Sequence, residues 1–293
     1  MKTVRNASEV ADLLRAAGVP HADTLAALAT PSIPIAAWIV QGEGLPPGAS
    51  RFGGAPDVPV GFLWPTHEDR TLAFLAQLDL AEVRAPGLPQ QGWLLFFCDL
   101  GEEGDGPPWG HEPAEAGGAR VIFIECERGA LTPMENPGID EEDEFNDPDL
   151  QRFDACHVMF RPVTLELPDR WDGLVESAGI SRQEVGDWED AYGDIVAELS
   201  GVNEDPPCHH LLGHAQLVQG DMREQCQHLT ADIHGVESAA SEWQLLLQLD
   251  SDDPDGIGPG WQWEDCGRLY FWIRKADLAA RAFDRAWMIL QTG

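Results

Sequence analysis

Two segments of the sequence repeat a pairing of side chains that could do chemistry, an amide and a carboxylate two residues apart. The first pair is Gln77 and Asp79, and the second is Gln248 and Asp250, each near the end of an apolar run. Alternate residues of a β-strand point to the same face, so the two members of each pair would lie about 6.6 Å apart on one face. Two such faces brought together would form a pseudo-symmetric cleft for a small ligand or for acid–base catalysis.

The loops beside these pairs add further candidate binding residues. A loop rich in glycine and proline precedes the first pair, and an acidic loop with two tryptophans follows the second. Glycine permits positive φ and proline fixes its own φ, so the first loop has a defined shape; such loops are frequent at binding sites, although many only turn a corner. The candidate residues on these loops and strands are Arg51, Gly53, Gly54, Pro56, Gln77, Asp79, Gln248, Asp250, Asp252, Asp253 and Trp263.

Metal binding is not predicted. Histidines and cysteines gather between Cys208 and His234, but without the tight paired spacings that mark a zinc site. A calcium loop is suggested by the acidic run after Asp250, yet with Gly256 at its sharp turn an EF-hand would need Asp and Glu where Ser251 and Gln262 stand. Turn-forming side chains are the simpler interpretation, and a metal-bound protein is kept only as a third alternative.

The sequence contains none of the short motifs of hydrolase nucleophiles, zinc proteases, phosphate loops or dinucleotide-binding turns. The glycines between Gly101 and Gly106 are interleaved with acidic residues where a phosphate would have to bind. We therefore predict no cofactor, and an enzyme is less favoured than a binding protein.

The elements that position the candidates are mainly strands. Each Gln/Asp segment is followed by a loop and an aromatic strand, Gly92–Phe97 or Gly267–Ile273, so each is expected to form a β-hairpin. Four of six aligned positions are identical between Phe74–Asp79 and Leu245–Asp250, which predicts an internal duplication. We expect one domain over residues 1–293, with halves at about 35–167 and 208–293 joined by a helical segment at 168–207.

Helices are predicted at the N-terminus, in the middle and near the C-terminus. Ser8 is a candidate N-cap for a helix through Ala17, and Ser181 with Glu184 forms a capping-box pattern before the second helical region. A short helix is expected from Lys275. Because strands do not alternate regularly with helices, the predicted fold class is α+β, strand-rich, with mainly antiparallel sheet.

Composition indicates a packed globular chain with an unusual charge. The 293 residues are 43% hydrophobic and include 11 tryptophans, enough to build a large core. Against 18 basic residues stand 51 acidic ones, a formal net charge of −33. That charge disfavours nucleic acid and anionic membranes and favours a basic protein partner, although solubility alone would also explain it.

The compartment expected from these features is the cytoplasm. No run approaches the ~20 apolar residues of a membrane span, and the N-terminal residues lack the apolar core of a signal peptide. The six cysteines form no Cys-x-x-Cys pair and are expected to be reduced thiols.

The chain resembles the YwqG-like family of bacterial proteins, which is built around a domain of unassigned function. The matching segments occur in the family's order and span most of the chain. They are Phe52–Pro56 with Pro59 and Trp64–Pro65, Phe74–Asp79, Leu88–Pro89, Gly92–Phe97, His210–Gly213 with Gln219, Leu245–Asp253, Gly267–Ile273, Asp277–Phe283 and Gln291. His214 and Ala215 depart from the family, which has an aromatic residue and a proline there. The resemblance implies a strand-rich α+β fold, no established activity and a weak suggestion of an immunity role.

Three functional hypotheses follow. The leading one is a cytoplasmic, non-enzymatic binding protein for a basic protein partner, with an immunity-like role as one form of it. The alternative is a small-ligand-binding protein or enzyme that uses the Gln77/Asp79 and Gln248/Asp250 faces as a cleft. A metal-bound protein is the third. The sequence predicts neither an oligomeric state nor the identity of a ligand.

Overall fold

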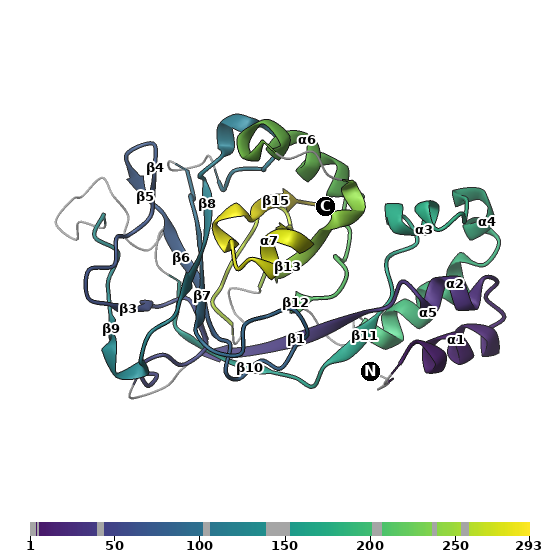
Figure 1. Cartoon of the computed structure of the whole chain (residues 1–293), viewed down its shortest axis with the longest axis horizontal. Helices are drawn as coiled ribbons and strands as arrows, with labels where there is room; N and C mark the ends of the chain where they lie inside the picture. Colours follow the sequence, from purple (N-terminus) through teal and green to yellow (C-terminus); the bar gives the residue numbers. More distant parts are fainter. Residues whose placement is uncertain are drawn as a thin grey trace.

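The computed structural model of the chain describes residues 4, 6–39, 44–101, 106–138, 153–200, 207–235, 239–252 and 258–293. Figure 1 shows a strongly curved, nearly barrel-shaped sheet with a group of helices extending from one end. Every pairing between the described strands is antiparallel. The predicted α+β, strand-rich fold class with mainly antiparallel sheet is therefore confirmed.

Eleven strands make up the main sheet, and four short strands form two separate ribbons. The main sheet contains β1 (Thr30–Ile39), β2 (Arg51–Phe52), β6 (Ala73–Asp79), β7 (Trp93–Cys98), β8 (Ala119–Ile124), β10 (Cys156–Phe160), β11 (Thr164–Glu166), β12 (His209–Leu212), β13 (Trp243–Asp250), β14 (Arg268–Arg274) and β15 (Trp287–Gln291). The ribbons pair β3 (Asp57–Pro59) with β9 (Leu131–Pro133), and β4 (Thr66–His67) with β5 (Arg70–Thr71).

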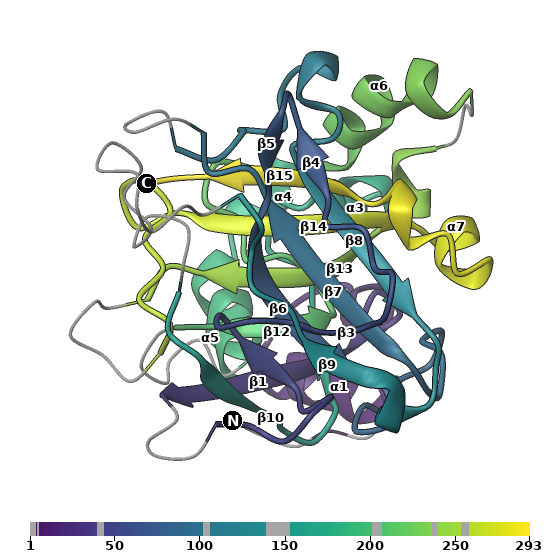
Figure 2. The same cartoon turned by 90° about the vertical axis from the view of Figure 1, so that its left-hand side faces the viewer.

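The order of the strands places four strands from each half of the chain on either side of a central pair. It runs β15-β14-β13-β12-β1-β10-β2-β6-β7-β8, so the antiparallel pair β1 and β10 lies at the centre with four strands on each side. We call β2-β6-β7-β8 the first arm and β12-β13-β14-β15 the second arm. Figure 2 shows β13 to β15 crossing β6 to β8 at a steep angle, so the two arms face each other across the core.

The two predicted hairpins form, and they share an irregularity. The β6–β7 register shifts between Phe74 and Ala76, and the β13–β14 register shifts between Leu245 and Leu247, at the aligned position of the two copies. A bulge at one position bends a strand and increases its twist, so both arms curve in the same way. The internal duplication stays a prediction, which this shared bulge supports.

Both faces of each arm are buried, for different reasons. The inner faces pack against each other, as in the edge-to-face contact of Phe96 and Phe271 at 5.1 Å between ring centroids. The outer face of the second arm is covered by α6 (Arg223–His234) through Met222 and Cys226, and that of the first arm by the β3/β9 ribbon through Val58. Because both faces of these strands are buried, their sequences are nearly continuous apolar runs.

The remaining helices form a separate lobe with a core of its own, seen at the right of Figure 1. It consists of α1 (Ala7–Ala16), α2 (Ala22–Ala26), α3 (Gly173–Ser177), α4 (Arg182–Gly186) and α5 (Glu189–Ser200), while α7 (Lys275–Ala279) follows β14. Within the predicted helical segment at 168–207, the described helices α3 to α5 thus share a core with the N-terminal helices. Among the helices of the described ranges, none combines the length and the apolarity needed to cross a bilayer.

Candidate functional site

Gln77 and Asp79 are structural residues of the first arm. Both side chains are buried, and the Gln77 amide donates to the Ala49 carbonyl at 3.1 Å and accepts from the Asp57 N–H at 2.7 Å. The Asp79 carboxylate accepts from the Ala81 N–H at 2.9 Å and pairs with Arg128. The Gln77 bonds attach the loop before β6 to the strand, and the Asp79 bonds hold the turn after β6 and Arg128.

Gln248 and Asp250 are structural residues of the second arm and bond to the chain on both sides of β12. The Gln248 amide donates to the Cys208 carbonyl and accepts from the Gln216 N–H, both at 3.0 Å. Asp250 accepts from the Cys208 N–H at 3.0 Å and pairs with Arg268 at 2.9 Å.

The cleft predicted from these four side chains therefore needs correction. Each is buried to 4% exposure or less and is already hydrogen-bonded to protein groups, so their donors and acceptors are used inside the fold. A polar group in the core is retained when it satisfies backbone groups that would otherwise be unpaired. The period-two pattern identified a shared face correctly, but that face is packed and not open to a ligand.

The glycine loop lies against the chain that enters β10. The Gly54 N–H donates to the Phe153 carbonyl at 2.8 Å, and a Cβ on Gly53 would lie 2.3 Å from the Asp154 carbonyl oxygen. Arg51 is buried and pairs with Asp57. The loop formed by Gly53, Gly54 and Pro56 thus has the fixed shape that its residues predict, and that shape serves a backbone-to-backbone contact.

The two predicted loops do meet, through aromatic rings. Phe52 contacts Trp261 at 4.9 Å between ring centroids, and Trp261 contacts Trp263 at 5.6 Å. Trp263 and Asp252 are buried, so neither is placed on an open binding surface. Asp253 lies outside the described residues.

The residues between Cys208 and His234 do not converge on one point. His209 and His210 are neighbours on β12, whereas Cys226 and His234 belong to α6. In the described part of the chain, no group of three or more His, Cys, Asp or Glu side chains is arranged to hold a metal ion.

A cavity of about 260 Å³ lies where the helical lobe meets the sheet, and we call it the α5 cavity. Helix α5 supplies Tyr192 and Val196 to its wall, β11 supplies Glu166, and the turn after β12 supplies His214. Arg268 also lines it. Sequence patterns alone did not single out Glu166, whereas His214 stood out as a member of the histidine and cysteine cluster and as a departure from the family resemblance.

The His214 imidazole has a defined protonation state. Its Nε2 lies 2.9 Å from the Leu28 carbonyl, which can only accept, so Nε2 carries the proton. Burial lowers the pKa of His214 to about 4, although Asp172 opposes the shift. The ring is therefore neutral at pH 7, and its Nδ1 is a buried acceptor without a hydrogen-bond donor within the described residues.

Glu166 is the second perturbed group of the α5 cavity. Burial raises the pKa of its carboxyl, against the opposing effect of His210, whose Nε2 lies 4.0 Å from Oε2. The His214 backbone N–H also approaches Oε2, at 3.3 Å. A buried carboxyl and a neutral imidazole in the wall of one cavity can bind a small polar ligand, and groups with perturbed pKa values also occur for structural reasons.

Fold and cavity together define a strand-rich α+β protein with a small cavity beneath its helical lobe. A family model described as a domain of unknown function, DUF1963, matches residues 50–292. The chain therefore belongs to the DUF1963 family. No curated protein matches the sequence.

Proposed function

We propose that this protein is a non-enzymatic, cytoplasmic binding protein whose partner is a basic protein, docked on the outer face of α5. The single observation that carries the proposal is a pair of exposed aspartates, Asp190 and Asp194, on a helix that Arg170, the neighbour of the exposed Trp171, contacts through an ion pair. An immunity-like role, with a toxin as the partner, is one form of it, and the resemblance to the YwqG-like family supports that form.

Most of the arginines form ion pairs with carboxylates of the same chain, so few remain to balance the other acidic side chains. Eleven arginines form ion pairs with carboxylates of the same chain. They are Arg15, Arg51, Arg70, Arg128, Arg170, Arg182, Arg223, Arg268, Arg274, Arg281 and Arg285. With 51 acidic and 18 basic residues in all, carboxylates outnumber the basic side chains that could neutralise them, and the formal net charge of −33 attracts a basic partner.

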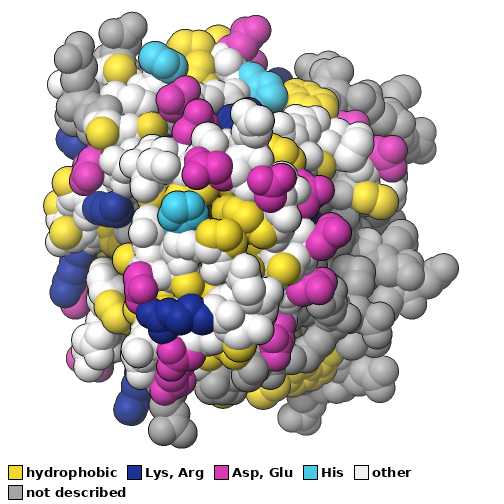
Figure 3. All heavy atoms as spheres, turned by 90° about the vertical axis from the view of Figure 1, so that its right-hand side faces the viewer, with side chains coloured by type: hydrophobic (Ala, Val, Ile, Leu, Met, Phe, Trp, Pro, Cys, Tyr) yellow, Lys and Arg dark blue, Asp and Glu magenta, His cyan; other side chains and the backbone are white. Residues whose placement is uncertain are grey.

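The face of α5 concentrates this excess. Asp190 and Asp194 are exposed and four residues apart, an arrangement that destabilises an isolated helix by a few tenths of a kcal/mol. Trp171 is 41% exposed, and its neighbour Arg170 reaches α5 through an ion pair with Glu189 at 3.7 Å. Figure 3 shows acidic side chains outnumbering basic ones on the side of the molecule that carries the helical lobe. An aromatic anchor among charges matches the anatomy of protein interfaces.

The test begins with capture from lysate at low salt and identification of a stoichiometric complex by intact mass spectrometry. The affinity of the purified partner is then measured for the wild type, for Trp171→Ala and for the double variant Asp190→Asn/Asp194→Asn. The matched control, Glu127→Gln/Glu135→Gln, removes the same charge from exposed positions outside the helical lobe.

We expect the α5 variants to bind the partner at least about tenfold more weakly than the wild type, and the affinity of the control to stay within about threefold of the wild-type value. The affinity of the wild type should fall as salt rises. Equal losses in the two double variants would show that only net charge matters. Salt-independent binding would contradict the proposal.

A small ligand in the α5 cavity is a second candidate function, favoured by Glu166 and His214 in its wall. Ala197 also lines this cavity, and Ala197→Leu would fill part of it. If a compound raises the melting temperature of the wild type and not of the filled variant, this candidate gains support. An equal rise in both proteins would count against it.

A further inference from the structure

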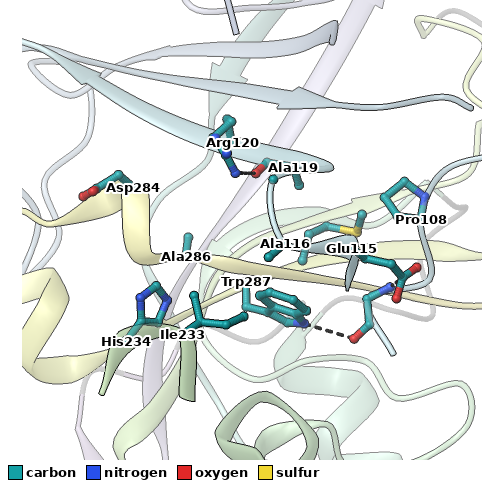
Figure 4. A pocket seen from close by; sticks show the side chains of 13 residues that line it. Pro108, Glu115, Ala116, Ala119, Arg120, Ile233, His234, Asp284, Ala286 and Trp287 are labelled. Carbon is teal, nitrogen blue, oxygen red and sulfur yellow. Dashed lines mark hydrogen bonds between the residues drawn. The ribbon is translucent and has the colours of Figure 1, made fainter. Parts of the chain in front are cut away.

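A second cavity lies at the seam between the two edge strands of the main sheet. Strands β8 and β15 end the strand order and are not paired with each other. Phe123 of β8 contacts Phe283, in the 3₁₀ turn Phe283–Arg285 before β15, at 5.4 Å between ring centroids. The Leu290 N–H of β15 donates at 3.0 Å to the Trp109 carbonyl, in the chain before β8. Where the edges remain apart, they enclose a space of about 310 Å³, which we call the seam cavity (Figure 4).

The walls of the seam cavity differ in character. Figure 4 shows Arg120 and Ala119 of β8 on one side, facing Ile233, His234 and Trp287 on the other. Ile233 is 42% exposed, and the Trp287 indole N–H already donates to the Gly110 carbonyl at 3.0 Å. The facing wall is therefore mostly apolar, with its indole donor satisfied.

Arg120 is held at this cavity without a carboxylate partner. In the described ranges, its guanidinium makes one hydrogen bond, from Nη1 to the Ala119 carbonyl at 3.1 Å, and no ion pair. Gly117, with φ of +105°, packs against it so closely that a Cβ there would lie 2.8 Å from Nη2. A guanidinium carries five N–H donors, so most of them stay available from a fixed position.

The other ionisable groups lining the seam cavity do not supply that partner. The Glu115 carboxylate accepts from the backbone N–H groups of Gly110, His111 and Glu112. Asp284 is exposed at the rim. Burial, with Arg274 and Arg285 nearby, lowers the pKa of His234, so this ring is neutral at pH 7.

We propose that the seam cavity binds a small monocarboxylate with an apolar body. The carboxylate accepts from the Arg120 guanidinium, whose planar fork matches two oxygens, and the apolar body packs on Ile233 and Trp287. The volume is at the lower end for ligand pockets, which restricts the ligand to a small molecule. A dianion such as phosphate is disfavoured, because Glu115, Asp284 and the net charge of −33 repel a second negative charge.

The experiment uses phenylacetate as the probe, with phenylacetamide as its neutral isostere and inorganic phosphate as the dianionic comparison. Binding to the full chain is followed by the NMR signal of the Trp287 indole N–H, assigned with Trp287→Phe. We expect phenylacetate to bind at least about tenfold more tightly than either comparison compound and to shift that signal.

Arg120→Gln should weaken phenylacetate binding about tenfold or more, and Arg120→Lys should weaken it less. The control is Arg281→Gln, an exposed arginine paired with Glu125, which should bind as the wild type does. Should the Arg120 variants lose their fold, Ala286→Leu, which fills the cavity from the residue just before β15, must abolish binding in their place.

The proposal is overturned by equal binding of acid and amide, by binding that survives Arg120→Gln, or by no saturation up to about 10 mM. Variants separate it from the basic-partner proposal. Arg120→Gln should weaken phenylacetate binding and leave the basic partner's affinity unchanged, whereas Trp171→Ala should do the reverse.

Discussion

Gln77 and Gln248 hold the chain in the same way, although they lie in opposite arms of the sheet. Each amide donates to one backbone carbonyl and accepts from a later backbone N–H, and the spacing from Ala49 to Asp57 equals that from Cys208 to Gln216. The two hairpins thus share a bulge, an amide clamp and an Asp–Arg pair.

The amide clamps make a first prediction. Gln77→Leu and Gln248→Leu should each lower the free energy of unfolding by about 2–4 kcal/mol, because two backbone groups lose their partners in the core. Urea denaturation measures the loss. Gln262→Leu, at an exposed position, should stay within about 0.5 kcal/mol. Losses below 1 kcal/mol at both clamps would show that water or local rearrangement replaces the amides.

The glycine loop makes a second prediction. Gly53 has φ of +57° and no room for a Cβ beside the Asp154 carbonyl, so Gly53→Ala should cost about 2–4 kcal/mol. Gly61 also has positive φ but open space, and Gly61→Ala should cost only about 1 kcal/mol. Thermal denaturation of the two variants separates backbone strain from steric overlap. Equal costs would mean that overlap contributes nothing at Gly53.

The buried ion pair between Arg223 and Asp172 makes a third prediction. Both Asp172 oxygens accept from Arg223 Nη1 at 2.8 Å, and the two side chains are almost fully buried. Asp172→Asn removes the buried counter-charge of Arg223 and leaves it only Asp221, whose Oδ1 lies 3.1 Å from Nη1, so the change should cost up to about 3–5 kcal/mol. The matched change Asp12→Asn breaks an exposed pair with Arg15 and should cost less than about 1 kcal/mol. A cost at Asp172 no larger than that at Asp12 would mean that Arg223 finds another partner.

The buried histidines make a fourth prediction, on acid stability. Burial lowers the pKa of His209 and of His214 from 6.5 to about 4, so the folded state binds fewer protons than the unfolded state. This contribution to stability is fully present above about pH 6.5 and is lost as pH falls toward 4. Each histidine can account for up to about 3 kcal/mol. The raised pKa of Glu166 acts in the opposite sense, since its contribution is lost as pH rises.

Unfolding free energies measured from pH 7.5 to 4 test this point. His209→Gln and His214→Gln should each flatten the acid side of the curve, even if they lower stability at pH 7. His228→Gln, at an exposed position of α6, should leave the slope unchanged. A wild-type curve without an acid slope in this range would contradict the prediction.

Local signals in the sequence were reliable where the interacting groups are close along the chain. The predicted capping box forms, with Ser181 accepting from the Glu184 N–H and the Glu184 carboxylate accepting in return. At the first helix the predicted cap was displaced. Asn6, and not Ser8, caps α1, because its side-chain oxygen accepts from the Glu9 N–H. Both residue types are good caps, and only the backbone path decides between them.

The sequence by itself determined the strand-rich α+β class, the two hairpins and the alternation that places each amide and carboxylate on one face. Only the tertiary structure decided which faces are open. Strand periodicity separates two faces of a sheet, but whether a face meets water depends on α6, the β3/β9 ribbon and the opposite arm, which come from distant parts of the chain. For the same reason no local pattern could reveal the α5 cavity or the seam cavity, since Glu166 meets His214 and Arg120 faces Trp287 only after the sheet has curved.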